Sequence, residues 1–313
     1  MFPTRTAAAP ALITLDVHEH PRLNAVLIKA AEFLSQINQK ATFFCPAALV
    51  RGDRQIARTL LELQGEGHHI GCHGLTHTRE EDPFSLSATE ELTLLRTATS
   101  ILEDLLGRAV FSFRAPVYRL SDRTLPILES LGYKADLSVV PQRVCFFSST
   151  PWSFRGVLAP RGIYHPDEKS PYRRGNLSIV EIPNSCFLLP IAHGAMTGFR
   201  SKGMAAILAC LMWEARNFKR VLVLSFHPET LAGDDLYYPN RRLRWADLVP
   251  RRYGGMALRY HFTDMLPEKS QQIAREVMFR VQERLDCMSV EKYVDSVYLN
   301  GKRSEHFIGV AET

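Results

Sequence analysis

The chain has 313 residues, of which 46% are hydrophobic and 23% charged, so it can bury a large core and is not a disordered chain. The formal net charge of +5 is too small and too diffuse to indicate nucleic-acid binding. Six cysteines without a CxxC pair are expected as reduced, mostly buried thiols rather than as a disulfide framework.

Apolar runs alternate with helical patterns along most of the chain. The expected elements, in chain order, are strand 11–16, helix 23–38, strand 40–46, helix 53–64, strand 68–73, helix 86–106, strand 110–116, helix 121–133, strand 134–140, strand 177–183, helix 201–217, strand 220–228 and a helix near 267–287. Ser87 and Glu90 form a capping box that predicts the start of the longest helix. Residues 141–176 show no such pattern, and we expect them to form a functional loop.

Strand–helix alternation of this kind predicts a parallel α/β fold. A barrel is favoured over an open sheet because the polar residues of interest follow the ends of strands, where barrel active sites are built. Neither a GxGxxG nor a GxxxxGK sequence is present, which disfavours nucleotide-binding folds. The expected division is a barrel domain at residues 1–235 and a C-terminal extension packed on it at residues 236–313.

Several polar side chains with metal-binding or acid–base chemistry follow these strands. Asp16 ends the first strand, and His18 and Glu19 come directly after it. His73 and His77 are four residues apart, so two imidazoles could converge on one cation, although a surface turn with two solvated histidines would look the same.

Two further strand ends carry an arginine, a tyrosine and a histidine. Arg114 could hold a carboxylate in its ionised form, or it could be solvated beyond an edge strand, and Tyr118 follows it. His227 ends a strongly apolar strand, where a buried structural histidine is at first sight the better interpretation than a general acid or base.

Taken together, "DVH", "HGLTH", "FRAPVY" and "LSFHP" occur in this order, each at a strand end. Over roughly residues 11–235 the chain resembles the metal-dependent polysaccharide deacetylases of carbohydrate esterase family 4. "KATFFCP", "LGYKADLSV" and "IVEIPNS" resemble strands of the same family. Each short match is weak alone, and the combination is specific.

The resemblance implies a distorted (β/α)7 barrel, here with a C-terminal helical extension, and a divalent metal ion, most often Zn²⁺. It implies an amide hydrolase that removes N-acetyl or O-acetyl groups from sugars. The roles carried over by position are catalytic base for Asp16, metal ligands for His73 and His77, orientation of the base for Arg114, general acid for His227 and tuning of that histidine for Asp136.

The first motif departs from the family pattern, because Val17 follows Asp16 and His18 stands where a metal-binding carboxylate is usual. A site of three histidines is chemically sound for zinc, so His18 is the expected third ligand, with Glu19 as the fallback. Alternatively, the metal binds weakly and the activity is lost. Tyr118, Glu19 and Trp152 are the expected substrate contacts.

No secretory leader is recognised and no apolar run could span a bilayer, so a cytoplasmic protein is expected. The expected substrate is therefore a sugar intermediate of surface polysaccharide biosynthesis, linked to a nucleotide or a lipid phosphate. Six arginines in residues 237–262 could bind a diphosphate or a membrane surface, and a solvated basic loop is an equal alternative. Other functions left open are a deformylase, a cyclic-amide hydrolase and a silent metal- or carbohydrate-binding homologue. No oligomeric state is predicted.

Overall fold

The computed structural model describes residues 9–142, 155–187, 189–190, 201–234, 245 and 267–298, and the fold is given for these. Its centre is one sheet in which all pairs of neighbouring strands are parallel. The strands of this sheet are β1 (Pro10–Asp16), β2 (Thr42–Cys45), β3 (His69–Cys72), β4 (Ser112–Phe113), β5 (Ala135–Asp136), β8 (Val180–Glu181), β11 (Leu222–Phe226) and β12 (Asp286–Met288).

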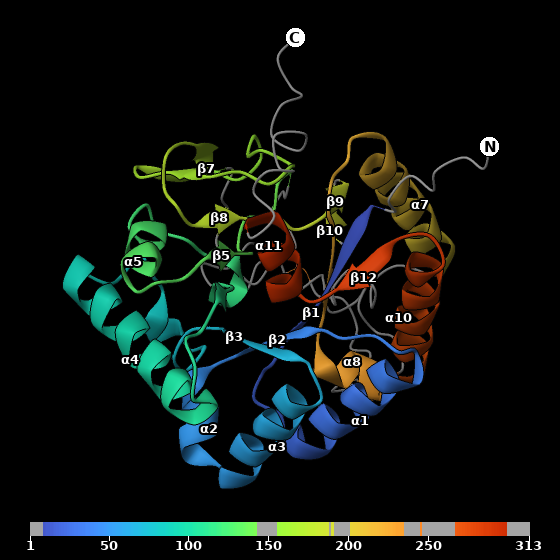
Figure 1. Ribbon diagram of the computed structural model, residues 1–313, viewed down its shortest axis with the longest axis horizontal. Helices are drawn as coiled ribbons and strands as arrows, with labels where there is room; N and C mark the ends of the chain where they lie inside the picture. Colours follow the sequence, from blue (N-terminus) through green and yellow to red (C-terminus); the bar gives the residue numbers. More distant parts are fainter. Residues whose placement is uncertain are drawn as a thin grey trace.

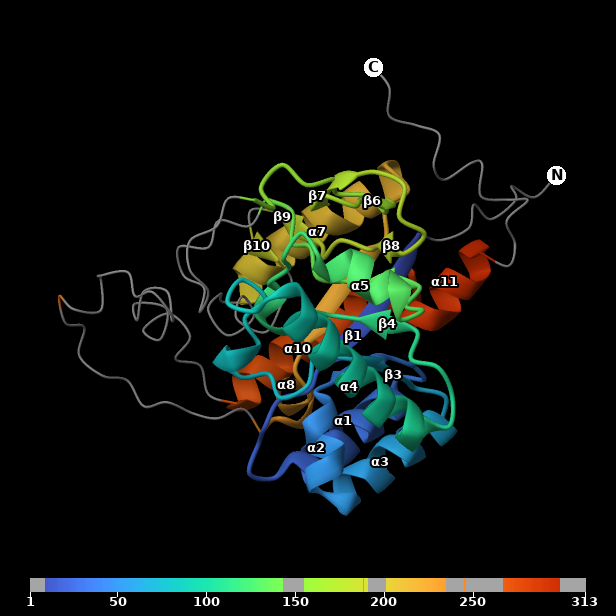
Figure 2. The same cartoon turned by 90° about the vertical axis from the view of Figure 1, so that its left-hand side faces the viewer.

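The sheet runs in the order β11-β1-β2-β3-β4-β5-β8 and curls into a half-barrel, and helices surround it in Figure 1. This is the expected distorted (β/α)7 barrel. The helices are α1 (Leu23–Gln36), α2 (Ala47–Gly52), α3 (Arg54–Gly65), α4 (Ala88–Leu106), α5 (Thr124–Ser130), α7 (Ser201–Asn217), α8 (Pro228–Ala232), α10 (Pro267–Gln282) and α11 (Val290–Tyr298), with short 3-10 helices η1 (Arg79–Glu81) and η2 (Pro116–Tyr118). Figure 2 shows the same arrangement from the side.

The first strand shows how the sheet separates its two faces. Ala11, Ile13 and Leu15 pack in the outer core together with the surrounding helices. Because side chains alternate along a strand, Leu12 and Asp16 point to the interior instead. Both faces are buried, which explains why the strand reads as an almost continuous apolar run.

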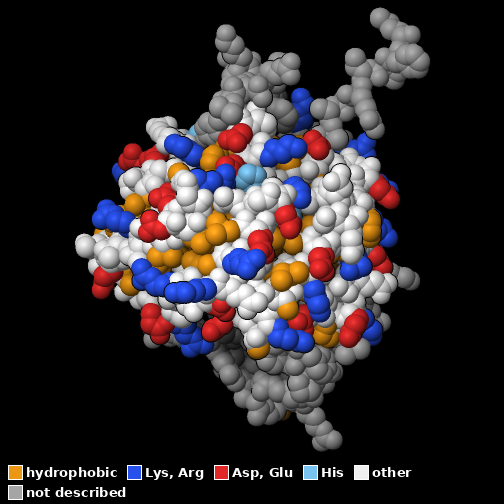
Figure 3. Space-filling model, turned by 60° about the horizontal axis from the view of Figure 1, so that its bottom comes forward, with side chains coloured by type: hydrophobic (Ala, Val, Ile, Leu, Met, Phe, Trp, Pro, Cys, Tyr) orange, Lys and Arg blue, Asp and Glu red, His pale blue; other side chains and the backbone are white. Residues whose placement is uncertain are grey.

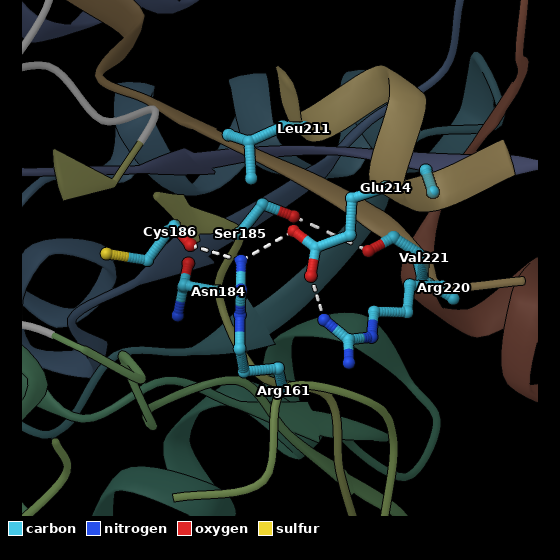
Figure 4. Close-up of a pocket in the computed structure, with 9 residues that line it drawn as sticks. Arg161, Asn184, Ser185, Cys186, Leu211, Glu214, Arg220 and Val221 are labelled. Atoms are coloured by element: carbon cyan, nitrogen blue, oxygen red, sulfur yellow. Dashed lines mark hydrogen bonds and ion pairs between the residues drawn. The ribbon is translucent and has the colours of Figure 1, made fainter. Parts of the chain in front are cut away.

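The sheet is open between β8 and β11, and side chains span this opening. The Ser185 hydroxyl accepts a hydrogen bond from the Val223 amide at 2.8 Å. Ser185 also lines a small hollow that is partly open to solvent, and Figure 4 shows the Glu214 carboxylate there between the guanidinium groups of Arg161 and Arg220. The opening is therefore bridged by polar side chains rather than by a backbone ladder.

The C-terminal extension is tied into the barrel. Strand β12 pairs in parallel with the first three residues of β1, and Val290 and Val294 of α11 pack with Leu12 in the interior cluster. Helix α10 contacts α7 and α8. The division at residues 235 and 236 stays a prediction, while these contacts show that residues 267–298 complete the same core.

Most expected elements are found, including α4 with the capping box of Ser87 and Glu90. The sequence did not indicate α2, α8, α11 or β12. It also did not indicate the antiparallel pairs β6 (Pro166–Asp167) with β7 (Ser170–Arg174) and β9 (Cys186–Phe187) with β10 (Leu189–Pro190). The segment 141–176 was expected as a loop without regular structure, and that is corrected by the β6–β7 hairpin. Residues 143–154 of this segment lie outside the described residues.

On the face shown in Figure 3, basic and acidic side chains are interspersed, with hydrophobic side chains between them. This mixture agrees with the small net charge of the sequence. Within the described part of the chain, no helix has both the length and the apolar character needed to cross a bilayer.

Candidate metal centre and catalytic site

The candidate site lies at the carboxyl ends of the parallel strands. Asp16 is the last residue of β1, His73 follows β3, Arg114 follows β4 and His227 follows β11. Since these strands are parallel neighbours, their carboxyl ends meet at one end of the barrel. The structure thus brings together side chains that are distant in the sequence.

Three histidines form the centre of this site. One potential ligand atom each from His18, His73 and His77 can be chosen so that all lie within 4.8 Å of one another. Their ring centroids are 4.6, 4.9 and 5.6 Å apart. Imidazoles that share one tetrahedral zinc at about 2.1 Å would have centroids roughly 5 Å apart, so the arrangement fits that ion.

His73 is prepared for metal binding by its surroundings. Its Nδ1 donates a hydrogen bond to the carbonyl oxygen of Arg114 at 2.7 Å, which leaves Nε2 as the ligand atom. Burial lowers the pKa of His73 to about 3, so the imidazole is neutral at physiological pH. A neutral imidazole with one committed nitrogen is the usual form of a zinc ligand.

His77 reaches the cluster through an unusual loop. Its φ of 61° lies in the left-handed region, and burial lowers its pKa. Its Nε2 is buried and makes no hydrogen bond within the described residues. A buried nitrogen without such a partner is costly in an apo protein, and a bound cation would satisfy it.

Glu81 of η1 organises this loop, and the sequence analysis did not single it out. Its carboxylate accepts hydrogen bonds from the amides of Leu75 and His77, both at 3.2 Å, and from the amide and hydroxyl of Thr76. Its only signal in the sequence is an acid four residues after His77. Carboxylates are common in polar loops, so that signal is weak.

Asp16 forms a buried ion pair with Arg114. The Arg114 Nη1 donates to the Asp16 Oδ1 at 2.6 Å and also to the hydroxyls of Thr14 and Ser225 at 2.9 and 3.1 Å. The guanidinium is fully buried and lies over the ring of Phe44, 4.5 Å from its centroid.

These neighbours decide the protonation state of Asp16. Burial alone would raise the pKa of its carboxyl, but the positive charge of Arg114, followed by interactions with His73 and His227, lowers it below its ordinary value. The side chain is therefore an ionised carboxylate at neutral pH, which is the form a general base requires.

Tyr118 was expected as a substrate contact, and the structure places its hydroxyl on the base. It donates to the Asp16 Oδ2 at 3.2 Å and lies 2.7 Å from the Ser225 hydroxyl. Val117 and Tyr118 have φ values of 48° and 60°. Left-handed backbone at a β-branched residue is strained, and such strain is concentrated at functional sites.

His227 lies at the edge of the cluster, 4.3 Å from His18 between ring centroids. Its Nδ1 is 3.1 Å from the Oε1 of Glu229, a residue that the sequence analysis missed. Glu229 follows Pro228 in the first turn of α8, so its side chain folds back toward the end of β11. A glutamate two residues after the histidine is its only sequence signal.

The expectation that Asp136 tunes His227 needs correction. Asp136 lies between Ala135 and Leu137, which both pack in the interior cluster, so its side chain points to the opposite face of β5. There it accepts a hydrogen bond from the Ser138 hydroxyl and is coupled to Glu181. The carboxylate that contacts the His227 ring is that of Glu229.

The remaining expected residues have different outcomes. Glu19, the fallback ligand and candidate substrate contact, is exposed and belongs to neither group of potential metal ligands among the described residues. Trp152 and most of the arginine-rich stretch at 237–262 lie outside the described residues. Their predicted roles stay predictions.

Comparison with known proteins agrees with this geometry. Residues 5–135 match the family model described as polysaccharide deacetylase. Over this part of the chain the protein is similar to the polysaccharide deacetylase family. The match ends at residue 135, so His227 and Glu229 lie beyond it and are placed in the site by the fold alone.

Two curated relatives share part of this family domain. A peptidoglycan deacetylase of Helicobacter pylori is 28% identical over 100 residues, which are 32% of each chain. A peptidoglycan deacetylase-like protein of Gibberella zeae is 28% identical over 103 residues, which are 33% of this chain and 29% of the relative. The chain thus spans about a third of the length of these relatives.

The fold is shared over a longer range. A Mycobacterium smegmatis crystal structure, of a protein named for the polysaccharide deacetylases, superposes with a TM-score of 0.58. The similarity covers 96% of this chain and 94% of the other at 16% identity. It therefore supports the fold from the first strand to the C-terminal elements.

Proposed function

We propose that the protein is a metal-dependent hydrolase that removes an N-acetyl, or an O-acetyl, group from a sugar. The observation that carries the proposal is a buried, ionised Asp16 that interacts electrostatically with His73 and His77, two members of a cluster of three histidines that fits a zinc ion. The polysaccharide deacetylase family and the peptidoglycan deacetylases among the relatives support a carbohydrate substrate.

His18, His73 and His77 would hold the ion. When bound, a divalent ion supplies a Lewis acid that polarises an amide carbonyl and makes water more acidic. Three neutral imidazoles leave a coordination position open, which is typical of catalytic rather than structural zinc sites. The identity of the metal as Zn²⁺ rests on this donor set.

The protein groups around the ion have separate tasks. Asp16 takes the proton of the attacking water, and Arg114 keeps the carboxylate ionised and oriented for that step. His227 gives a proton to the departing amine, without which the amine is a poor leaving group. Glu229 orients the His227 ring through Nδ1 and leaves Nε2 to face the substrate.

The more specific expectations also belong to the proposal. The substrate would be a sugar intermediate of surface polysaccharide biosynthesis, carried on a nucleotide or a lipid phosphate, and the protein would act in the cytoplasm. Tyr118 would contact the substrate in addition to Asp16. The arginine-rich stretch at 237–262 would be the anchor for a phosphate group or an anionic membrane surface.

The replacement of an acid by His18 favours one alternative, a homologue that binds metal or carbohydrate without catalysis. Acetate release from an N-acetylated sugar nucleotide and an N-acetylated oligosaccharide, before and after zinc is restored to chelator-treated protein, separates the two. We expect zinc-dependent release by the wild type. Asp16→Asn should retain zinc and lose turnover.

Three other results would be informative. Zinc-loaded wild type that releases no acetate from either substrate would contradict the proposal and favour the silent homologue. Release of formate in place of acetate from formylated substrates would identify a deformylase. Full activity of Asp16→Asn would show that the base is assigned to the wrong residue.

A further inference from the structure

His18 belongs to two groups of potential metal ligands, and only the first is used by the proposed function. The second group is His18, His227 and Glu229, whose ligand atoms can also be chosen within 4.8 Å of one another. All three side chains are half-buried, so they line the site without being sealed from solvent. The two groups share the His18 ring.

The geometry of the second group is compatible with a shared ion. The ring centroids of His18 and His227 are 4.3 Å apart, and the His227 Nδ1 lies 3.1 Å from the Glu229 Oε1. Two ligand atoms that each lie about 2.1 Å from one zinc are themselves about 3.0–3.4 Å apart. The distance therefore suits a common cation as well as it suits a hydrogen bond.

The chemistry of the second group points to the same class of ligand. Two histidines and one glutamate are a donor set found in catalytic zinc sites. Asp16, which belongs to neither group, interacts electrostatically with His73 of the first group and with His227 of the second. His18 can serve both ions at once only through its two ring nitrogens, and this requires its ring N–H proton to pass to solvent, which makes the second ion the weaker one.

We propose that His18, His227 and Glu229 bind a second, weaker divalent cation, and that this cation inhibits the enzyme. A cation on the His227 Nδ1 takes the place of the proton shared with Glu229, so loss of the Nε2 proton would leave a metal-bound imidazolate and the ring is no longer an effective acid. The same residue can thus donate a proton or bind metal, but not both at once. The binding claim stands without the proposed function, and only the inhibitory consequence rests on it.

Equilibrium dialysis of chelator-treated full-length protein against increasing zinc tests the binding claim. We expect two zinc ions per wild-type chain, the second with lower affinity. Glu229→Gln should bind the first ion normally and weaken the second at least tenfold, since loss of even an outer partner of a ligand costs about 10–100-fold in affinity. Glu32→Gln, an exposed change on α1, should retain both ions.

Retention of the first ion by Glu229→Gln shows that the variant is folded. A single ion in the wild type, or an unchanged second ion in Glu229→Gln, would overturn the proposal. His73→Ala, which removes a ligand of the first group only, should lose the tight ion and keep the weak one. Loss of both ions in this variant, with unchanged circular dichroism, would contradict two separable sites.

Acetate release measured at one and at twenty equivalents of zinc tests the inhibition. Each variant is compared with its own activity at one equivalent, so changes in basal rate do not matter. The wild type should lose most of its activity at high zinc, and Glu229→Gln should not. Equal inhibition of both proteins would refute the inhibitory role, whereas no release at any zinc concentration would refute the proposed function and leave the dialysis result standing.

Discussion

At the scale of single residues, the buried pair of Arg114 and Asp16 is the interaction on which the candidate base depends. Arg114→Met removes the charge and keeps much of the volume, so Asp16 is left buried without its cation. We expect the free energy of unfolding to fall by about 3–5 kcal/mol at pH 7, as for other broken buried pairs. Urea denaturation of the two proteins measures this difference.

The pH dependence of this loss follows from the lowered pKa of Asp16. A carboxyl whose folded pKa is depressed stabilises the protein above its unfolded pKa of about 3.9, and the contribution disappears as the pH falls toward the folded value. The free energy of unfolding that Arg114→Met loses relative to the wild type should therefore be largest at pH 7 and smaller near pH 3. Arg119→Met, which breaks a less buried pair with Asp82, is the matched control and should cost less.

Glu181 is a second buried acid, with the opposite pKa shift. Burial, followed by the neighbouring Asp136, raises the pKa of Glu181 well above its ordinary value. Such a group contributes stability that is complete below its unfolded pKa and is lost as the pH rises through the folded pKa. Glu181→Gln, which mimics the protonated form, should remove this loss.

Unfolding free energies of the wild type and of Glu181→Gln at pH 5 and pH 7.5 decide this point. The wild type should lose stability relative to the variant as the pH rises between these values. A difference between the two proteins that does not change with pH would show that Glu181 titrates alike in the folded and unfolded chains.

At the scale of elements, the loop after β3 places two of the three metal ligands. Gly74 has a φ of 78°, and a Cβ atom there would lie 2.9 Å from the Pro116 Cγ and 3.0 Å from the Glu81 carboxylate. Gly74→Ala should cost at least about 1–2 kcal/mol for the left-handed backbone alone. It should also weaken zinc binding, since His77 would move.

Gly52→Ala is the control for this prediction. Gly52 ends α2, its φ is not positive, and a Cβ atom there would meet nothing within 4 Å. Its unfolding temperature and zinc affinity, measured by competition with a chelating dye, should match the wild type. If Gly74→Ala behaved like this control, the loop geometry would not matter for the metal site.

The elements that could be predicted from sequence are those with a local pattern. Strand β11 consists of five consecutive buried residues that are apolar or small. The capping box of Ser87 and Glu90 marks the start of α4. Strands such as β12, of three residues, owe their conformation to a partner at the other end of the chain. No periodicity develops within so few residues, so tertiary pairing alone defines them.

The same distinction applies to the site. Asp16, the histidines and Arg114 could be predicted because each follows a strand, and parallel strands bring their ends together. Glu81 and Glu229 could not, because each acts by folding back from a helix onto a neighbour. Asp136 was placed on the right strand, but the side of the strand depends on register, which the resemblance did not determine.

At the scale of the whole molecule, residues 267–298 are packed into the core of the barrel and are not a separate appendage. Met278 of α10 is buried in the outer core, whereas its neighbour Phe279 is 46% exposed. Met278→Ala should lower the free energy of unfolding by about 2–5 kcal/mol, in the range of buried large-to-small changes. Phe279→Ala should cost clearly less, and both proteins should unfold in one transition that includes the metal site.

Tryptophan fluorescence and zinc release, followed during the same urea titration, measure that coupling. If Met278→Ala unfolded in two steps, with zinc released only in the second, the extension would be an independent unit. That result would support a boundary near residue 235 as a true domain boundary.

The central claim is that His18 replaces the usual carboxylate and binds the metal together with His73 and His77. A crystal structure of the zinc-loaded protein, with anomalous data collected on both sides of the zinc absorption edge, tests it directly. We expect an anomalous peak about 2.0–2.1 Å from one nitrogen of each of the three histidines. A zinc ion bound by His73 and His77 with His18 turned away, or no peak among these rings, would contradict it.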